Sequence, residues 1–233
     1  MAGSERSDGR RSRWTQHNEQ RRVEILDAAV AAIEASAPGT EVPVAQIAAV
    51  ANINRTVLYR HFADRADLDR AIQGHIFRHL QAQVLPVITL EGTPRQIIRR
   101  IVGAYVGWAA EHPSLHRFAD QQPLGVGGTE GDLALTQLAR QVRDLIAYAA
   151  DALGVDIDDD TRHALDPLVF GFLGMAIATV HRWLTRSERR PAQDALADLL
   201  TEAIWLQISG MTAARGVVLE PDVPVEEQLR LLA

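Results

Sequence analysis

The stretch ANINRTVLYRHF, residues 51–62, gathers basic, hydroxyl and aromatic side chains without any acidic residue among them. An arginine at the start of a helix can donate two hydrogen bonds to guanine, and a threonine there can contact a base edge or a thymine methyl. Phenol, guanidinium and imidazole groups one turn later can reach phosphate oxygens. Taken alone, such a run also fits an ordinary helix with a solvated face. The residues expected to contact DNA are Asn54, Arg55, Thr56, Tyr59, Arg60 and His61.

Two short helices joined by a tight turn would position these side chains. Apolar residues at helical spacing after Pro43 predict a helix over residues 44–51, and Val44 at its start is included among the expected DNA contacts. Asn52 tolerates the left-handed conformation that often follows a helix, and Asn54 can cap the next helix by accepting from backbone N–H groups. The pattern is that of a helix-turn-helix, whose second helix can enter the major groove.

The rest of the chain shows helical spacing throughout, so the sequence predicts an all-α fold without strands. An N-terminal three-helix domain is expected, followed by a larger helical domain. The helices predicted outside the helix-turn-helix cover residues 17–36, 65–85, 94–111, 113–120, 131–153, 158–185 and 191–214. The predicted segments are a flexible basic arm (1–16), a helix-turn-helix domain (17–64), a helical domain (65–215) and a tail of uncertain order (216–233).

Composition excludes several kinds of chemistry. The 233 residues contain no cysteine, which rules out disulfides, thiolate zinc sites and cysteine nucleophiles. All 24 basic residues are arginine, and the absence of lysine rules out Schiff-base chemistry and a phosphate-loop lysine. No apolar run approaches the ~20 residues that span a bilayer, and no signal-peptide pattern begins the chain. We therefore expect a soluble, cytoplasmic protein.

The net charge of −6 is unevenly distributed along the chain. Residues 1–22 carry six arginines against three acidic residues, in a segment that is rich in Gly and Ser. Arg10, Arg11 and Arg13 in this segment are expected to lie along phosphates or in a minor groove. A solvated tail without a partner is the alternative interpretation of the same composition.

The run VPVAQIAAVANINRTVLYRHFADRADL, residues 42–68, resembles the DNA-binding signature of TetR-type transcriptional repressors. The family pattern is an I-A-x-x-A helix, a turn and an L-Y-x-H-F recognition helix, followed by a basic residue and an acidic–apolar pair. Asn52 stands where the family usually has Gly, and Arg65 stands where it usually has Lys. The resemblance implies that Arg65 contacts a phosphate, and that double-stranded DNA with a palindromic operator is the partner.

The resemblance further implies a homodimer whose last two long helices form a four-helix bundle with the partner subunit. Residues 170–178 are nearly apolar all round, which agrees with burial on more than one side. Filling of the monomer core is the alternative. The resemblance also implies a small, largely apolar effector that releases the repressor from DNA. Residues that could line its cavity are Tyr105, Trp108, Phe118, Tyr148, Phe170 and Met175, although each also fits plain core.

Other candidate sites are weaker. The loop GVGGTEGD, residues 125–132, lacks the lysine and preceding strand of a phosphate-binding loop. The run DIDDD, residues 156–160, lacks the Gly and Glu that a calcium loop needs downstream. His112 and His116 have metal-ligand spacing, but Pro113 interrupts a helix through both. We expect no metal, cofactor or enzymatic activity; a regulator without an effector and a helical enzyme remain as alternatives.

Overall fold

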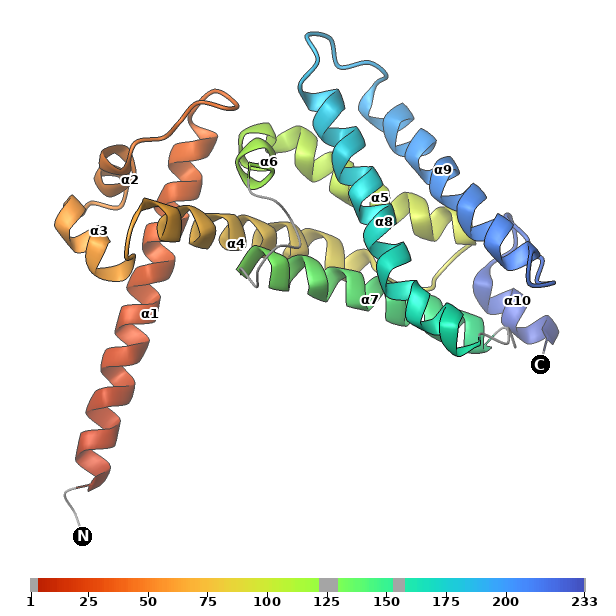
Figure 1. The fold of residues 1–233 in the computed structure, drawn as a ribbon, viewed down its shortest axis with the longest axis horizontal. Coiled ribbons are helices and arrows are strands. Elements are labelled where there is room, and N and C mark those ends of the chain that lie inside the picture. The colour runs from red at the N-terminus through yellow and green to blue at the C-terminus, as the bar shows by residue number, and fades with distance from the viewer. Residues whose placement is uncertain (1–3, 122–129, 153–157, 233) are drawn as a thin grey trace.

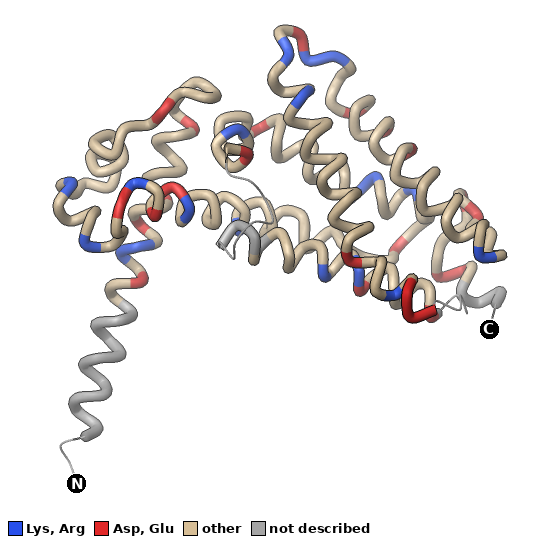
Figure 2. Tube along the Cα trace, viewed as in Figure 1, with Lys and Arg blue, Asp and Glu red and all other residues tan. Residues whose placement is uncertain are grey.

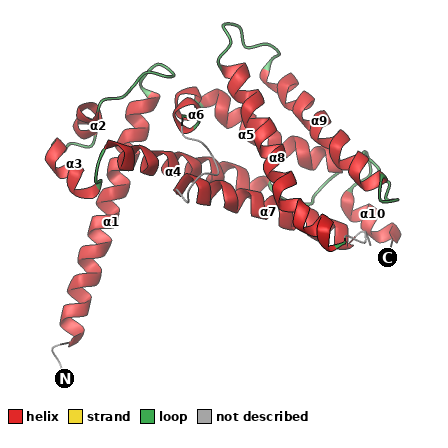
Figure 3. Ribbon diagram, in the orientation of Figure 1, coloured by secondary structure: helices red, strands yellow, loops and turns green. Residues whose placement is uncertain are grey.

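The computed structural model describes residues 4–121, 130–152 and 158–232, with the backbone alone described for residues 4–16 and for a few residues near the ends of later helices. All regular elements in these ranges are helices (Figure 3), as predicted. Their bounds are α1 Ser4–Glu34, α2 Val44–Val50, α3 Arg55–His61, α4 Arg65–Val84, the 3-10 turn η1 Leu85–Val87, α5 Pro94–Glu111, α6 Pro113–Ala119, α7 Glu130–Ala152, α8 Asp159–Leu184, α9 Gln193–Ala213 and α10 Val225–Leu232.

The first three helices form a helix-turn-helix unit at one end of the molecule (Figure 1). Asn52 adopts φ of 52°, the left-handed conformation that the sequence predicts for it. Asn54 caps α3, since its Oδ1 accepts a hydrogen bond of 2.9 Å from the Val57 N–H. Both predicted roles of these asparagines in the turn are confirmed.

The fourth helix runs from the helix-turn-helix unit into the larger domain (Figure 1). Two reciprocal bonds fix its start: Asp64 Oδ1 accepts from the Asp67 N–H at 2.7 Å, and Asp67 Oδ2 accepts from the Ala63 N–H at 2.9 Å. The helix ends just before Pro86, which cannot donate a helical hydrogen bond. Helix α4 packs on α1 of the helix-turn-helix unit and on α5, α6 and α7 of the larger domain.

The larger domain is a layered set of helices around one apolar core. Helix α4 packs on α7, α5 packs on α9, and α7 packs on α8. A capping box starts α5, in which Thr93 Oγ1 accepts from the Gln96 N–H and Gln96 Oε1 accepts from the Thr93 N–H. Apart from the start of α1, the bounds of the predicted helices agree with the predicted ranges to within about two residues, which is the usual uncertainty of helix ends.

Both ends of the chain are more regular than the sequence predicts. Helix α1 begins at Ser4 rather than near residue 17, so residues 4–16 are helical in place of the predicted flexible arm. Gly9 is the only glycine between residues 4 and 34, and no proline interrupts the pattern. At the other end, Val225 N–H donates to the Gly92 carbonyl at 3.0 Å, which anchors α10 beside the start of α5.

Candidate DNA-binding and ligand-binding sites

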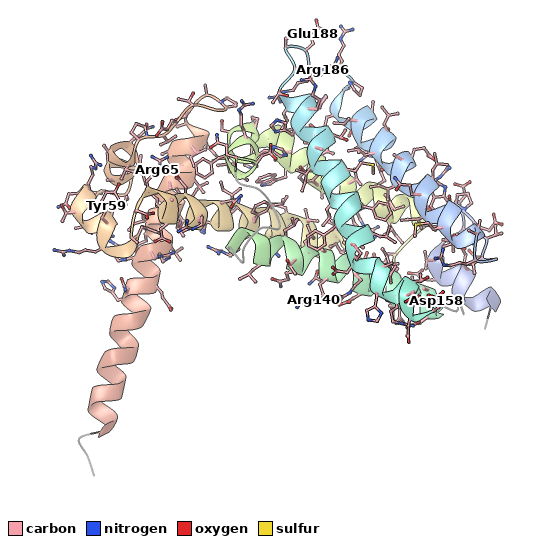
Figure 4. The ribbon with its side chains drawn as sticks, viewed as in Figure 1. Tyr59, Arg65, Arg140, Asp158, Arg186 and Glu188 are labelled. Atoms are coloured by element: carbon pink, nitrogen blue, oxygen red, sulfur yellow. The ribbon has the colours of Figure 1, made fainter. Side chains whose placement is uncertain are left out.

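The outward face of α3 carries the predicted DNA contacts. Arg55, Thr56, Tyr59 and Arg60 are exposed, and Tyr59 projects from the outer edge of the molecule (Figure 4). On the opposite face Leu58 is completely buried, so that it fixes the rotation of α3 about its axis. The structure therefore brings together the predicted hydrogen-bonding groups on one accessible surface. Figure 2 shows basic residues on α3 and on the neighbouring part of α1.

Arg22 on α1 holds the end of α3, a role that sequence reasoning missed. Its Nη1 donates to the His61 carbonyl at 2.8 Å, and its guanidinium carbon lies 4.4 Å from the centre of the Phe62 ring. Burial, and after it the charges of Arg21 and Arg22, lower the pKa of His61 below its ordinary 6.5. Burial and these two cations therefore disfavour the protonated imidazole of His61 in the free protein.

Two residues of the predicted DNA-contacting set are engaged inside the protein. Arg65 donates from Nε to both carboxylate oxygens of Asp69, at 2.9 and 2.8 Å, and from Nη1 to the Val42 carbonyl at 3.1 Å (Figure 4 shows its position). It thus fastens the start of α4 to the loop before α2, and this placement does not support the expected phosphate contact. Val44 is only 8% exposed and belongs to the core, so its side chain is not placed to contact DNA.

The side chains of Arg10, Arg11 and Arg13 lie outside the described residues, although their backbone belongs to α1. Their contact with phosphates or a minor groove stays a prediction. All three precede Arg21 and Arg22 on the helix that supports α3.

A cavity of about 180 Å³ lies in the larger domain. Its wall is built by side chains from α4 to α9, and nearly all of them are aliphatic or aromatic. Tyr105 and Trp108 on α5 border it, as predicted for residues of a ligand cavity. The other four candidates do not border it: Phe118, Phe170 and Met175 are partly buried elsewhere, and Tyr148 is 63% exposed.

The polar groups of this cavity gather beside α6. The Tyr105 hydroxyl lies 2.8 Å from His116 Nε2, and the buried His116 Nδ1 has no hydrogen-bond partner among the described residues. Next to them His181 Nδ1 lies 2.6 Å from Asp120 Oδ2. Burial lowers the pKa of His116 to about 4, and burial together with the Asp120 charge raises the pKa of Tyr105. Tyr105 and His116 are therefore both neutral near pH 7.

Helix α6 connects this cavity with the helix-turn-helix unit. Gln73 Nε2 on α4 donates to the Ala119 carbonyl at 2.7 Å, and Ser114 Oγ donates to the Ser36 carbonyl at 2.9 Å. His112 Nδ1 also contacts Glu34 Oε1 at the end of α1. A displacement of α6 by a ligand would therefore act on both α1 and α4.

Solved structures of other proteins share this fold. A TetR-family transcriptional regulator from Streptomyces coelicolor superimposes with a TM-score of 0.63 at 20% identity, over 92% of this chain and 88% of that one. RolR, solved in complex with the ligand resorcinol, superimposes with a TM-score of 0.60 at 20% identity, over 90% of this chain and 100% of that one. The chain has the fold of the TetR-family transcriptional regulators. The predicted resemblance to TetR-type proteins is thus confirmed for the fold.

The sequence comparison agrees with this TetR-type fold. An uncharacterised HTH-type transcriptional regulator of Mycobacterium tuberculosis is 26% identical over 215 residues, which are 91% of this chain and 87% of the relative. No model of a known protein family matches the chain. The similarity therefore extends from the helix-turn-helix through most of the larger domain.

The remaining candidate sites gain no support from the TetR-type structure. Among the described residues, no group of three or more His, Asp or Glu side chains could hold a metal ion. His112 and His116 face different partners, Glu34 and Tyr105, rather than a shared position. The glycine-containing loop 125–132 lies mostly outside the described residues, as do Asp156 and Ile157 at the start of the acidic run.

Proposed function

We propose that the protein is a dimeric, cytoplasmic transcriptional regulator that binds a palindromic operator through α3 and is released from it by an apolar effector. The observation that carries the proposal is the pairing of two sites in one chain. One is the exposed polar face of α3, held by the buried Leu58. The other is the apolar cavity of about 180 Å³ in the larger domain, which is lined in part by residues of α4 and α6.

Recognition of DNA would divide between the two ends of α3. Arg55 and Thr56 at its start would contact base edges in the major groove, and Tyr59, Arg60 and His61 would contact phosphates. Two copies related by two-fold symmetry would read half-sites about 34 Å apart, which is one turn of the double helix. Any change in the separation of the two α3 helices would therefore weaken operator binding.

The dimer would use the outer faces of α8 and α9. Leu199 and Leu206 on α9 lie one heptad apart and are 62% and 63% exposed. On α8 a Cβ added at Gly171 or Gly174 would meet nothing within 4 Å, so this face is open in the monomer. One side-chain contact connects the two helices, since Gln207 Nε2 on α9 lies 3.9 Å from the sulfur of Met175 on α8.

Helix α8 is long and apolar enough to cross a membrane by length and composition alone, with 22% of that apolar window buried in the monomer. A four-helix interface would cover this surface instead, since apolar helix faces of this size need a partner. A protein–protein interface accounts for both the exposed leucines of α9 and the open glycines of α8. The alternative that α8 merely fills the monomer core gains no support from this exposure.

Release from DNA would follow from the contacts of α6. A ligand in the cavity would bear on Tyr105 and His116, and the shift of α6 would pass to α4 through Gln73 and to α1 through Ser36. A coupling of this kind requires a ligand that binds the released conformation more tightly than the DNA-bound one. RolR, which shares the fold, was solved in complex with the ligand resorcinol.

Selection of genomic fragments by the purified protein tests this function. We expect recovered fragments to share a palindrome, and an electrophoretic mobility shift on that palindrome to require the exposed face of α3. A regulator without an effector would retain the palindrome but show no response of its DNA complex to any ligand of the cavity. Failure to enrich any sequence would contradict the proposed function itself.

A further inference from the structure

A second cavity of about 200 Å³ adjoins the first one. Several side chains border both, among them Ile98, Ile146, Phe172 and Ile208. An engineered apolar cavity of about 150 Å³ is large enough to bind benzene. Two adjoining cavities of this size therefore suit an elongated molecule of about a dozen carbon atoms better than a single ring.

The polar end of this space lies at Tyr105 and His116, and it has a hydrogen atom to donate. Two neutral groups carry two polar hydrogens, one on the phenol and one on the imidazole, and the 2.8 Å bond between them uses only one. If Tyr105 donates to Nε2, the spare hydrogen lies on His116 Nδ1; if Nε2 donates, it lies on the Tyr105 hydroxyl. In either tautomer no acceptor for the spare hydrogen is found among the described residues.

Trp108 has another buried donor close to this cavity. Its indole borders the cavity, but its Nε1, like His116 Nδ1, has almost no accessible surface and no acceptor among the residues that the structure describes. Buried donors without acceptors are rare in native proteins and destabilise them. A ligand oxygen would therefore accept from the Tyr105 hydroxyl, in the tautomer in which His116 Nε2 donates to that hydroxyl.

The charges around the first cavity disfavour an ionised ligand. Asp120 places a carboxylate on its wall, and no arginine is among the described side chains that line it. A buried ligand carboxylate would lie near this like charge, whose described partner is His181 Nδ1 at 2.6 Å. A ligand ammonium would have to displace His181 from Asp120, and it would leave the Tyr105 hydroxyl without an acceptor.

The far cavity offers a less suitable place for a head group. Arg215 borders it, but its Nη1 already donates to the Met211 carbonyl at 3.0 Å and its Nη2 to Thr161 Oγ1 at 3.1 Å. The charge of Arg215 also helps to lower the pKa of Asp158, after hydrogen bonds to Thr161, so an acidic group already lies near it. The polar group of a ligand is therefore better placed at the α5–α6 end.

We infer that the effector of the proposed regulator is an uncharged, elongated apolar molecule with one oxygen acceptor, such as an ester or ketone carbonyl, held by the Tyr105–His116 pair while its chain extends into the second cavity. The role of this molecule as an effector rests on the proposed function, whereas the binding preference is a property of the protein alone.

Isothermal titration calorimetry on the full chain without DNA tests the preference. The probes are methyl nonanoate, decanoate, decylamine and decane, which contain ten carbon atoms each and differ in the polar group. We expect methyl nonanoate to bind at least about ten-fold more tightly than decanoate or decylamine, because only the ester supplies an acceptor without a charge. Tighter binding of decanoate or decylamine, or no binding of the ester, would overturn the inference.

Variants separate the hydrogen bond from the shape of the cavity. Tyr105→Phe should weaken the binding of methyl nonanoate about three- to ten-fold and leave the binding of decane unchanged. Only the ester has an oxygen that accepts from the Tyr105 hydroxyl. Tyr148→Phe, at the exposed tyrosine of α7, is the matched control and should change neither. Equal loss of both probes in Tyr105→Phe would show a packing role for Tyr105 and contradict the assignment of the polar end.

A block in the second cavity tests the path of the chain. Ala149 borders only that cavity, and Ala149→Phe should weaken methyl nonanoate by about ten-fold or more while methyl pentanoate keeps its affinity. Equal affinity of methyl nonanoate for the wild type and for Ala149→Phe would contradict the extension of the ligand chain into the second cavity. Binding of the ester without any effect on DNA would leave this preference intact and contradict the proposed regulation instead.

Discussion

Gln73 on α4 and Ala119 on α6 are joined by a buried hydrogen bond of 2.7 Å, in which the Gln73 amide donates to the Ala119 carbonyl. Gln73 is 2% exposed, so water is not available to replace this donor if it is removed. The bond links the helix that carries the helix-turn-helix unit to the helix that borders the ligand cavity.

Gln73→Met should keep the volume of the side chain and remove this bond. We expect the free energy of unfolding to fall by about 1–3 kcal/mol, because the Ala119 carbonyl is left without its donor. The response of the DNA complex to a bound ligand should fall as well. Urea unfolding and mobility shifts measure the two effects, with Gln83→Met at an exposed position of α4 as the control. An unchanged ligand response in Gln73→Met would exclude this bond from the coupling.

Arg55→Ala should reduce affinity for the selected operator by about 1–3 kcal/mol and leave binding to random DNA nearly unchanged, because a base contact acts only on the cognate sequence. Fluorescence anisotropy with both DNAs measures the difference. Arg140→Ala is the control variant, because it also removes one positive charge, from the exposed surface of α7 (Figure 4). An equal loss on both DNAs would identify Arg55 as a phosphate contact.

Deletion of residues 1–16 should weaken DNA binding and flatten its dependence on salt concentration. Each phosphate contact that is lost reduces the slope of log K against log salt by about 0.9. Anisotropy titrations at several salt concentrations give this slope for the full and shortened chains. Identical slopes would mean that Arg10, Arg11 and Arg13 do not contact DNA.

Gly174→Arg should give a folded monomer that no longer binds the palindrome. A side chain at Gly174 meets nothing within 4 Å in the monomer, so the substitution is not expected to unfold it. At a subunit interface the same charge would be buried without a partner. Sedimentation and circular dichroism measure the two properties, with Leu133→Arg at an exposed position of α7 as the control. A dimeric, DNA-competent Gly174→Arg protein would place the interface elsewhere.

The pH dependence of stability should report the buried His116. Its pKa of about 4 in the folded protein lies below its ordinary 6.5, so the unfolded chain binds the extra proton first as pH falls. The stabilisation is complete above pH 6.5 and is lost as pH decreases toward 4. Between pH 7 and pH 5 the loss should be about 2 kcal/mol.

Urea unfolding at both pH values should show this loss in the wild type and a smaller loss in His116→Phe. The exposed His163 on α8 provides the control variant His163→Phe, which should keep the wild-type difference. A His116→Phe protein with the full wild-type pH dependence would show that another group causes it.

The helix-turn-helix could be predicted because its signals are local. Asn52 and Asn54 set the turn by their own backbone and side-chain chemistry, which depends little on the rest of the fold. The outward face of α3 follows from the burial of Leu58 and Phe62 four residues apart. The bond of Arg65 to Val42 could not be predicted, because Val42 is brought to it only by the packing of the helices, and a phosphate contact of Arg65 stays a prediction.

The ligand cavity could be predicted only in part. Tyr105 and Trp108 lie on the amphipathic face of α5, where one side of the helix is clearly apolar. On α8 apolar residues lie on all sides, so the sequence does not distinguish a cavity from an interface at Phe170 and Met175. Tyr148 lies near the edge of the apolar stripe of α7, where the helical spacing does not determine whether an aromatic side chain is buried, and in the structure it is exposed.

Helix α1 contacts both α3 and the start of α6, so a tilt of α1 would move the two together. Arg22 donates to the end of α3, and Glu34, 12 residues further along α1, contacts His112 just before α6. At 1.5 Å per residue, Arg22 and Glu34 are about 18 Å apart along α1. A tilt of α1 by about 10° about its contact with His112 would therefore displace the Arg22 contact by about 3 Å. A shift of that size equals the length of a hydrogen bond. A small rotation near the cavity is therefore enough to move the base-reading helix out of register with its half-site, while the interior of the helix-turn-helix unit keeps its packing.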